Sequence, residues 1–340
     1  MKKKELENRQ LNIGIEILRF LLCFWIVIIH CSNVKKAHQS FLSKKFHVPT
    51  FIFLSFYFSF QAFRKREITK IISRFQRLLI PYVLWPSIIL IINNFLHFFF
   101  SFGQFSKKLT MNDMYVQILV GSRFHGVFWF QFNLLFLSLS FTIISFIFKE
   151  KNLEILKLLG IIAFYLHISQ INYKFLFNYE KYIKGSLGGL IELLPIAVIG
   201  CIFSSVNLLL KIKNFSYNSK LIMLFIICVL FKYKIFTILN GCIYSNVPLN
   251  LFASTILFIF FGSLSFNKLK KKNIIIIYAT KFTGGIYYTH TIFRSYLTKY
   301  SIFFHKRTYL SSTFIYIICY YFCFIGNKLF EYSKLKYLFI

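Results

Sequence analysis

Long apolar runs recur along the whole chain, and they constrain its fold more than any other feature. As a helix, about 20 apolar residues at ~1.5 Å each cross the ~30 Å hydrocarbon core of a bilayer. Hydrophobic residues make up 57% of the 340 residues and charged residues only 15%, against roughly 25% charged in a soluble domain. We therefore predict an all-α, multi-pass integral membrane protein, a bundle of about ten transmembrane helices. The expected spans are residues 13–31, 47–63, 79–102, 126–148, 153–170, 187–210, 219–236, 248–266, 274–303 and 311–330.

The chain is strongly basic, with a net charge of +31 from 41 Lys and Arg against 10 Asp and Glu. In a soluble protein this excess would suggest a nucleic-acid partner, but here the basic residues lie mostly in the loops, so no nucleic acid is expected. Cytoplasmic loops carry the excess of Lys and Arg in membrane proteins. This bias predicts cytoplasmic tails at 1–12 and 331–340 and a single membrane domain at 13–330. The oligomeric state is not predicted.

The first apolar run contains three ionisable residues, Glu16, Arg19 and His30. An ionisable group in lipid costs at least about 2.5 kcal/mol, so it usually faces a partner or a polar cavity. Glu16 and Arg19 are three residues apart, close enough to pair on one helix face. Two interpretations remain open at this point: interface anchors at both ends of an ordinary span, or functional groups inside the bundle.

A basic segment, Arg64 to Arg77, connects the second and third expected spans. Its apolar residues recur at helical spacing with basic residues on the other side, which predicts a helix lying on the inner membrane surface. The basic face can serve anionic membrane lipid, the interpretation favoured by spacing alone. It can instead form a phosphate site, since Arg74 and Arg77, three residues apart, can both point at one polyanion.

All eight histidines map to the outer half of the spans or to outer loops. Depths estimated at ~1.5 Å per residue put His30 about 27 Å and His290 about 25 Å from the inner boundaries of their spans, so the two could share a level. Glu192 is an acidic residue well inside a span, and Lys281, Arg294, His290 or His30 could be its partner. Carboxylates or thiolates at metal-ligand spacing do not accompany the histidines, so no metal is expected.

Two motifs resemble the membrane-bound acyltransferase 3 family, which acylates sugars and other extracytoplasmic acceptors. The first is Arg19 and His30 with ten residues between them, in ILRFLLCFWIVIIH. The second is an Arg-x-x-Arg pair, Arg74 and Arg77, in SRFQRLLIPYVLW. Weaker similarities are VPTFIFLS, VFWFQFNLL and GGIYYTHTIF. Two departures stand out: Phe56 replaces a common glycine, and the first span opens with Glu16-Ile-Leu where Asp-Gly-Leu is common.

The resemblance implies an acyltransferase that moves an acyl group, expected to be acetyl, from acyl-CoA to a hydroxyl of an extracytoplasmic glycan or glycolipid. Arg74 and Arg77 would bind the donor phosphates. His30 would be the general base, or less economically a covalent nucleophile, and Arg19, held by Glu16, would orient the donor. His290 and Glu192 are further candidates for binding the acceptor. Two alternatives stay open: a transporter or flippase of a lipid-linked sugar, and an inactive family member.

Overall fold

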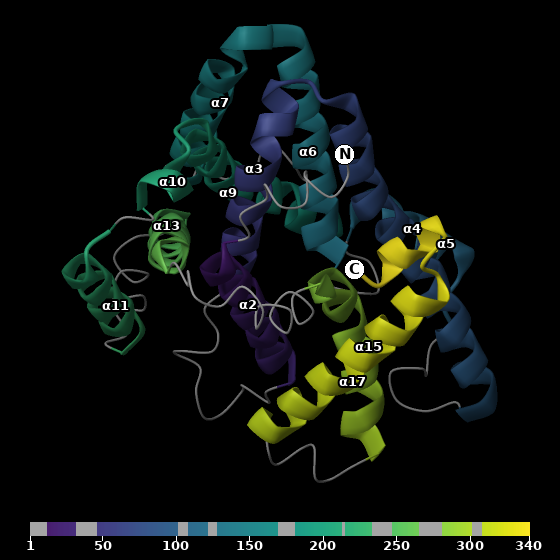
Figure 1. Cartoon of the computed structure of the whole chain (residues 1–340). Helices are drawn as coiled ribbons and strands as arrows, with labels where there is room; N and C mark the ends of the chain where they lie inside the picture. Colours follow the sequence, from purple (N-terminus) through teal and green to yellow (C-terminus); the bar gives the residue numbers. More distant parts are fainter. Residues whose placement is uncertain are drawn as a thin grey trace.

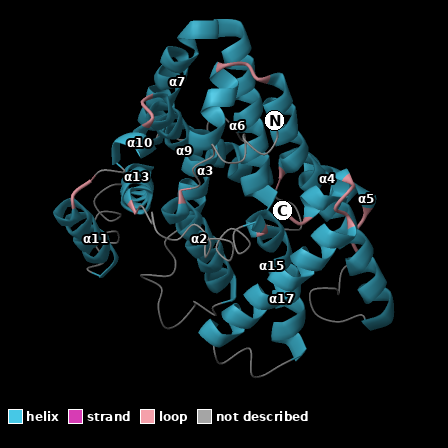
Figure 2. Ribbon diagram, viewed as in Figure 1, coloured by secondary structure: helices cyan, strands magenta, loops and turns pink. Residues whose placement is uncertain are grey.

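The computed structural model is almost entirely helical, with short connecting turns, in the part of the chain that it describes (Figure 1). No strand occurs in these residues (Figure 2), so the predicted all-α class is confirmed for them. The predicted tail at 1–12 lies, apart from Asn12, outside this part. The described residues are 12–31, 46–100, 108–121, 128–168, 181–212, 215–232, 247–264, 281–300 and 308–340.

Each of the ten expected spans contains a helix. In chain order these are α2 (Ile13–Cys31), α3 (His47–Arg64), α4 (Ile68–Phe100), α6 (Phe128–Phe148), α7 (Asn152–Ile168), α9 (Lys181–Ser205), α11 (Tyr217–Lys232), α13 (Val247–Ser263), α15 (Thr283–Tyr300) and α17 (Thr308–Leu329). Shorter helices are α5 (Met111–Val120), α10 (Leu208–Ile212) and the 3-10 turns η2 (Lys149–Lys151) and η3 (Lys334–Leu338).

Four stretches in the described residues are long and apolar enough to cross a membrane. They are Ile13–His30, Ile68–Phe95, Phe128–Leu166, which takes in α6 and α7, and Leu310–Leu329. Several other helices are apolar but shorter, such as Asn250–Ser263 in α13. The number of ten spans and the cytoplasmic location of the termini therefore stay predictions.

The prediction of a separate surface helix at Arg64 to Arg77 is wrong. Arg64 ends α3, a tight turn with Arg66 at φ 53° follows, and α4 then runs unbroken through Pro81 and Pro86. Exposed apolar side chains already line α4 in its first turns, Ile68 at 57% and Ile72 at 50% exposure. The start of α4 thus shares its outer face with the rest of the span, and proline is tolerated within membrane helices when neighbours satisfy the backbone.

The central helix of one half of the bundle is α3, which packs against α9, α13 and α6 (Figure 1). Its inner face carries phenylalanines with no exposed surface, Phe53, Phe56, Phe60 and Phe63. In the other half, α2 packs against α17 and α15, and α13 contacts both α2 and α3. Large aromatic rings fill these interfaces, so van der Waals packing holds helices together where lipid gives no hydrophobic drive.

The predicted tail at 331–340 folds back onto the bundle. Leu338 and Phe339 are buried, and η3 contacts α4, α15 and α17. Trp85 of α4 donates a hydrogen bond from its Nε1 to the carbonyl oxygen of Leu338 at 3.2 Å. The apolar ending Leu338, Phe339 and Ile340 gives this segment surface to bury, a signal that the charge count of the loops does not register.

Candidate functional site

One face of α2 carries the ionisable residues and meets α15. Arg19, Cys23 and His30 share this face because they are four and eleven residues apart on a helix of 3.6 residues per turn. Arg19 Nη2 donates to Thr283 Oγ1 at 3.4 Å, and Cys23 Sγ donates to the Thr283 carbonyl at 3.7 Å. Further along, the rings of His30 and His290 are 5.0 Å apart. The contact partners rise together in number along the two helices, from Cys23 and Thr283 to His30 and His290. The helices α2 and α15 therefore run in the same direction.

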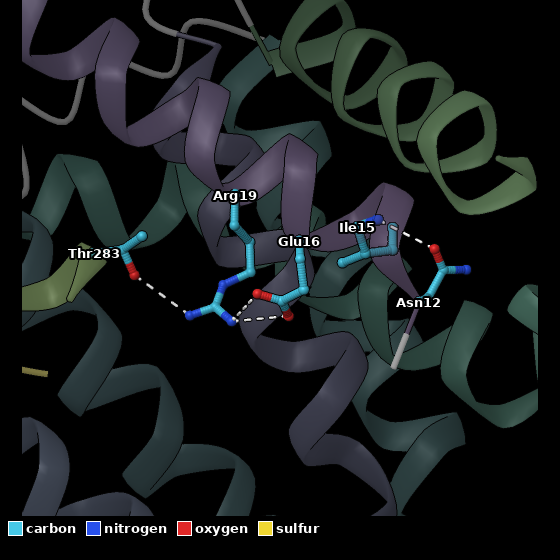
Figure 3. A network of polar contacts seen from close by, with 5 residues as sticks. All are labelled: Asn12, Ile15, Glu16, Arg19 and Thr283. Carbon is cyan, nitrogen blue, oxygen red and sulfur yellow. Dashed lines mark hydrogen bonds and ion pairs between the residues drawn. The ribbon is translucent and has the colours of Figure 1, made fainter. Parts of the chain in front are cut away.

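At one end of this interface Arg19 forms the expected ion pair with Glu16 (Figure 3). Arg19 Nη1 lies 3.1 and 3.0 Å from the two carboxylate oxygens, and the Arg19 and Glu16 side chains are 35% and 15% exposed. Asn12 fixes the start of α2, since its Oδ1 accepts from the Ile15 amide at 3.2 Å. The guanidinium is thus held between its own helix and α15, which leaves it little rotational freedom.

At the other end His30 and His290 lie side by side, so the common level predicted from depth is confirmed. His290 is fully buried, and its Nδ1 lies 3.0 Å from the carbonyl oxygen of Ile286 on the previous turn. A carbonyl oxygen only accepts, so Nδ1 carries a proton. Arg294 is one turn beyond His290 on the same face of α15.

Arg74 points into the bundle, where hydroxyl groups surround its guanidinium. Nη1 donates to Ser59 at 2.5 Å, Nη2 to Ser55 at 2.9 Å, and Nε and Nη2 to Ser138 at 3.1 and 3.0 Å. Ser55 and Ser59 belong to α3 and Ser138 to α6. One side chain of α4 therefore joins three helices through charge-assisted hydrogen bonds.

Arg77 lies in different surroundings, although it is only three residues from Arg74. Its side chain is exposed and folds along its own helix, with Nε 3.2 Å from the Ser73 carbonyl and Nη2 3.3 Å from Ser73 Oγ. The two guanidinium groups do not converge on a common point as the spacing predicted. Their proposed role in donor binding stays a prediction, and Arg77 is the one of the two on the surface.

The residue that departs from the family pattern, Phe56, packs beneath Arg74. It has no exposed surface, its ring centroid is 5.3 Å from the Arg74 guanidinium carbon, and the Phe141 ring is 4.5 Å away. A cation over an aromatic face is attracted by the ring quadrupole, so Phe56 compensates part of the cost of burying this charge.

Glu192 lies at the α9–α13 interface. Its Oε1 accepts a hydrogen bond from Asn250 Nδ2 at 3.4 Å, a partner outside the set that the sequence suggested. α9 packs mainly on α3, α7 and α6, whereas Arg19 and His30 lie where α2 meets α15. The geometry therefore gathers Glu16, Arg19, His30 and His290 along one interface and leaves Glu192 in another. Its role in acceptor binding stays a prediction.

Sequence reasoning missed Thr283, Cys23 and the hydroxyls around Arg74. A usable signal existed only for Ser55 and Ser59, two hydroxyls one helical turn apart in an otherwise apolar span. Among the residues that the structure describes, no three His, Cys, Asp or Glu side chains lie close enough to hold a metal ion.

Comparison with known proteins adds one finding to this geometry. No curated protein and no solved structure matches the chain. A family model described as an acyltransferase domain matches residues 12–327. That range includes all four stretches suited to membrane crossing, except the last two residues of the fourth, and all of the interface between α2 and α15. Because the match covers nearly the whole chain, the protein is a multi-pass membrane protein that belongs to the acyltransferase 3 family.

Proposed function

We propose that the protein transfers an acyl group, in the simplest case acetyl, from cytoplasmic acyl-CoA to a hydroxyl of an extracytoplasmic glycan or glycolipid. The observation that carries this proposal is the shared face of α2, where Arg19 and His30 are both packed against α15. They are eleven positions apart in the sequence, which is about 16 Å along a helix. A group that enters near Arg19 therefore needs only a flexible arm of that length to bring its reactive end to His30.

Donor binding would begin with Arg77, whose exposed guanidinium suits a phosphate of the coenzyme because the planar fork makes two parallel hydrogen bonds. Arg19 would act next, on the pantetheine arm or the thioester. Its own orientation is set by Glu16 and Thr283. Arg74 would support the donor site by fixing the start of α4 against α3 and α6, on the helix that also carries Arg77.

Transfer would take place at the two histidines. The acceptor hydroxyl oxygen attacks the thioester carbonyl, its proton passes to His30, and the carbon–sulfur bond breaks to release the coenzyme thiolate, which takes the proton back. Imidazole suits this exchange because its unperturbed pKa lies near neutrality. His290, whose Nδ1 proton is held by the Ile286 carbonyl, would present Nε2 toward this region and position His30 or the acceptor.

The test is acyl transfer in proteoliposomes. Purified protein, radiolabelled acetyl-CoA and a glycolipid fraction should give labelled glycolipid, and His30→Ala should abolish the labelling while the protein still inserts. His97→Ala, a histidine variant at the far end of α4, is the matched control and should keep activity. Labelled product from His30→Ala would remove His30 from the mechanism. Glycolipid flux without acyl-CoA would support the flippase, and a folded but silent wild type would support an inactive family member.

A further inference from the structure

The segment Ser333–Ile340 returns from the end of α17 into the bundle and is held there by its own structure. Ser333 caps the 3-10 turn η3, since its side chain accepts from the Leu335 amide at 3.1 Å. Beyond the turn, Leu338 and Phe339 are 6% and 7% exposed. We call residues 333–340 the returning segment.

Three glycines form the surface against which the returning segment packs, and we call this surface the glycine seat. Gly284 and Gly285 lie at the start of α15 and Gly326 lies near the end of α17. A Cβ atom at Gly326 would come within 2.6 Å of Phe339 ring carbons, and one at Gly285 within 2.7 Å of the Phe339 carbonyl oxygen. One at Gly284 would collide with the backbone of Ile340. None of the three glycines has a positive φ, so the requirement is for space and not for backbone freedom.

Aromatic contacts fasten the segment to the neighbouring helices. The Phe339 ring lies 5.8 Å from that of Phe322 on α17 and 6.4 Å from that of Trp85 on α4, and Trp85 also donates to the Leu338 carbonyl. Trp85 in turn stacks on Tyr288 of α15 at 6.2 Å. The segment therefore closes a ring of contacts through α4, α15 and α17.

The seat adjoins the residues of α15 that meet α2. Gly284 directly follows Thr283, which accepts hydrogen bonds from Arg19 and Cys23. The carbonyl of Gly285 accepts from Thr289 Oγ1 at 2.9 Å, one residue before His290. A displacement of the segment would therefore act first on the turn that carries Thr283, and only afterwards on the histidines one to two turns further along.

We propose that the returning segment is a positioning element for the donor side of the site: by filling the glycine seat it fixes Thr283 where it holds Arg19. This inference rests on the proposed acyl transfer. Loosening the seat should raise the KM for acyl-CoA about tenfold, as expected for the loss of one hydrogen bond to a charged group. The accompanying loss in kcat should be smaller than the change in KM, because the histidine pair lies one to two turns further along the same helix.

The decisive experiment enlarges the side chain at Gly326 and then makes the side chain at Phe339, which packs against it, smaller. Gly326→Ala should raise the KM for acyl-CoA, and adding Phe339→Leu should restore it, because the smaller side chain makes room for the new methyl group. Gly160→Ala on α7 is the matched control, since the atoms nearest to a Cβ there belong to the Val198 side chain, at 3.2 Å, far from the returning segment. If the double variant is no better than Gly326→Ala, or if Gly326→Ala has the wild-type KM, the proposal is overturned.

A second readout does not depend on activity. Cys323 is fully buried, and a Cβ at Gly285 would lie 2.7 Å from its Sγ, so it reports on the same seat. With the other six cysteines replaced by alanine, maleimide labelling of Cys323 should rise in Gly326→Ala and fall again with Phe339→Leu. Unchanged labelling of Cys323 would overturn the proposed packing of the returning segment against the three glycines. The expected labelling pattern, together with no acyl-CoA-dependent activity in the protein that keeps all its cysteines, would support the packing of the returning segment and reject the proposed function instead.

Discussion

Arg74→Lys separates two roles that the sequence alone assigns to one motif. Lysine keeps the charge but replaces the planar fork by a single ammonium, which cannot reach three hydroxyls on two helices at once. In the structure the fork makes four hydrogen bonds to Ser55, Ser59 and Ser138. Arg77 makes hydrogen bonds only along its own helix, so Arg77→Lys removes nothing that joins helices.

The magnitude follows from how many serine partners on α3 and α6 the lysine cannot reach. Hydrogen bonds between membrane helices average about 0.6 kcal/mol and reach about 1.7 kcal/mol. If lysine keeps one of the three serine partners, the absence of the other two hydrogen-bonded pairs lowers the free energy of unfolding by about 1–3 kcal/mol. Arg77→Lys should change it by less than about 0.5 kcal/mol, as is usual for exposed positions.

The assay is denaturant unfolding of the protein in mixed micelles, combined with the KM for acyl-CoA for both variants. We expect Arg74→Lys to change mainly stability and Arg77→Lys to change mainly the KM. A double-mutant cycle with Ser59→Ala then isolates the Arg74–Ser59 contact, with an expected coupling of about 0.6–1.7 kcal/mol. Wild-type stability in Arg74→Lys, together with a raised KM, would refute the reasoning and return Arg74 to the donor site.

Three further variants test the remaining contacts. His290→Asn should lower kcat about 100-fold with an unchanged KM for acyl-CoA, because His30 or the acceptor would lose its positioning and with it a general-base contribution of about that size; full activity would exclude His290 from the reaction. Glu16→Gln keeps the shape but removes the charge that holds Arg19, and should raise the KM for acyl-CoA in initial-rate assays, whereas a wild-type KM would show that Thr283 suffices. Phe56→Gly restores the residue common in the family and should cost about 3–5 kcal/mol in unfolding free energy, since it empties a buried site; a gain in stability would contradict the packing described under Arg74.

The sequence predicted the helices and the contacts that depend only on position along a span. Glu16 and Arg19 pair because three residues separate them, and His30 meets His290 because depth along two spans can be counted. The direction of the Arg74 side chain was beyond this reasoning, because it depends on which face of α4 meets α3 and α6. The returning segment was also missed. Its seat is formed by glycines from two helices, and no local sequence pattern predicts that these glycines lie close together.

The contacts at the two ends of the α2–α15 interface lie on one rigid element, and this predicts that they are energetically coupled. Thr283 and His290 are seven residues apart, about 10 Å along α15. Effects of substitutions at that distance usually add to within about 0.5 kcal/mol when the residues share no partner. Here Thr283 and His290 share α15 itself, and a shift of this helix that breaks the Arg19–Thr283 hydrogen bond also changes the spacing of the histidine rings.

We therefore expect Thr283→Val and His290→Asn to be non-additive in kcat/KM, with a combined loss that falls short of the sum of the single losses by more than about 0.5 kcal/mol. Valine has nearly the shape of threonine, so the variant removes the hydroxyl without emptying the site. Thr313→Val on α17 is the matched control and should be additive with His290→Asn. If Thr283→Val and His290→Asn were additive, α15 would not transmit a displacement from Thr283 to His290. The donor and acceptor sides would then work independently.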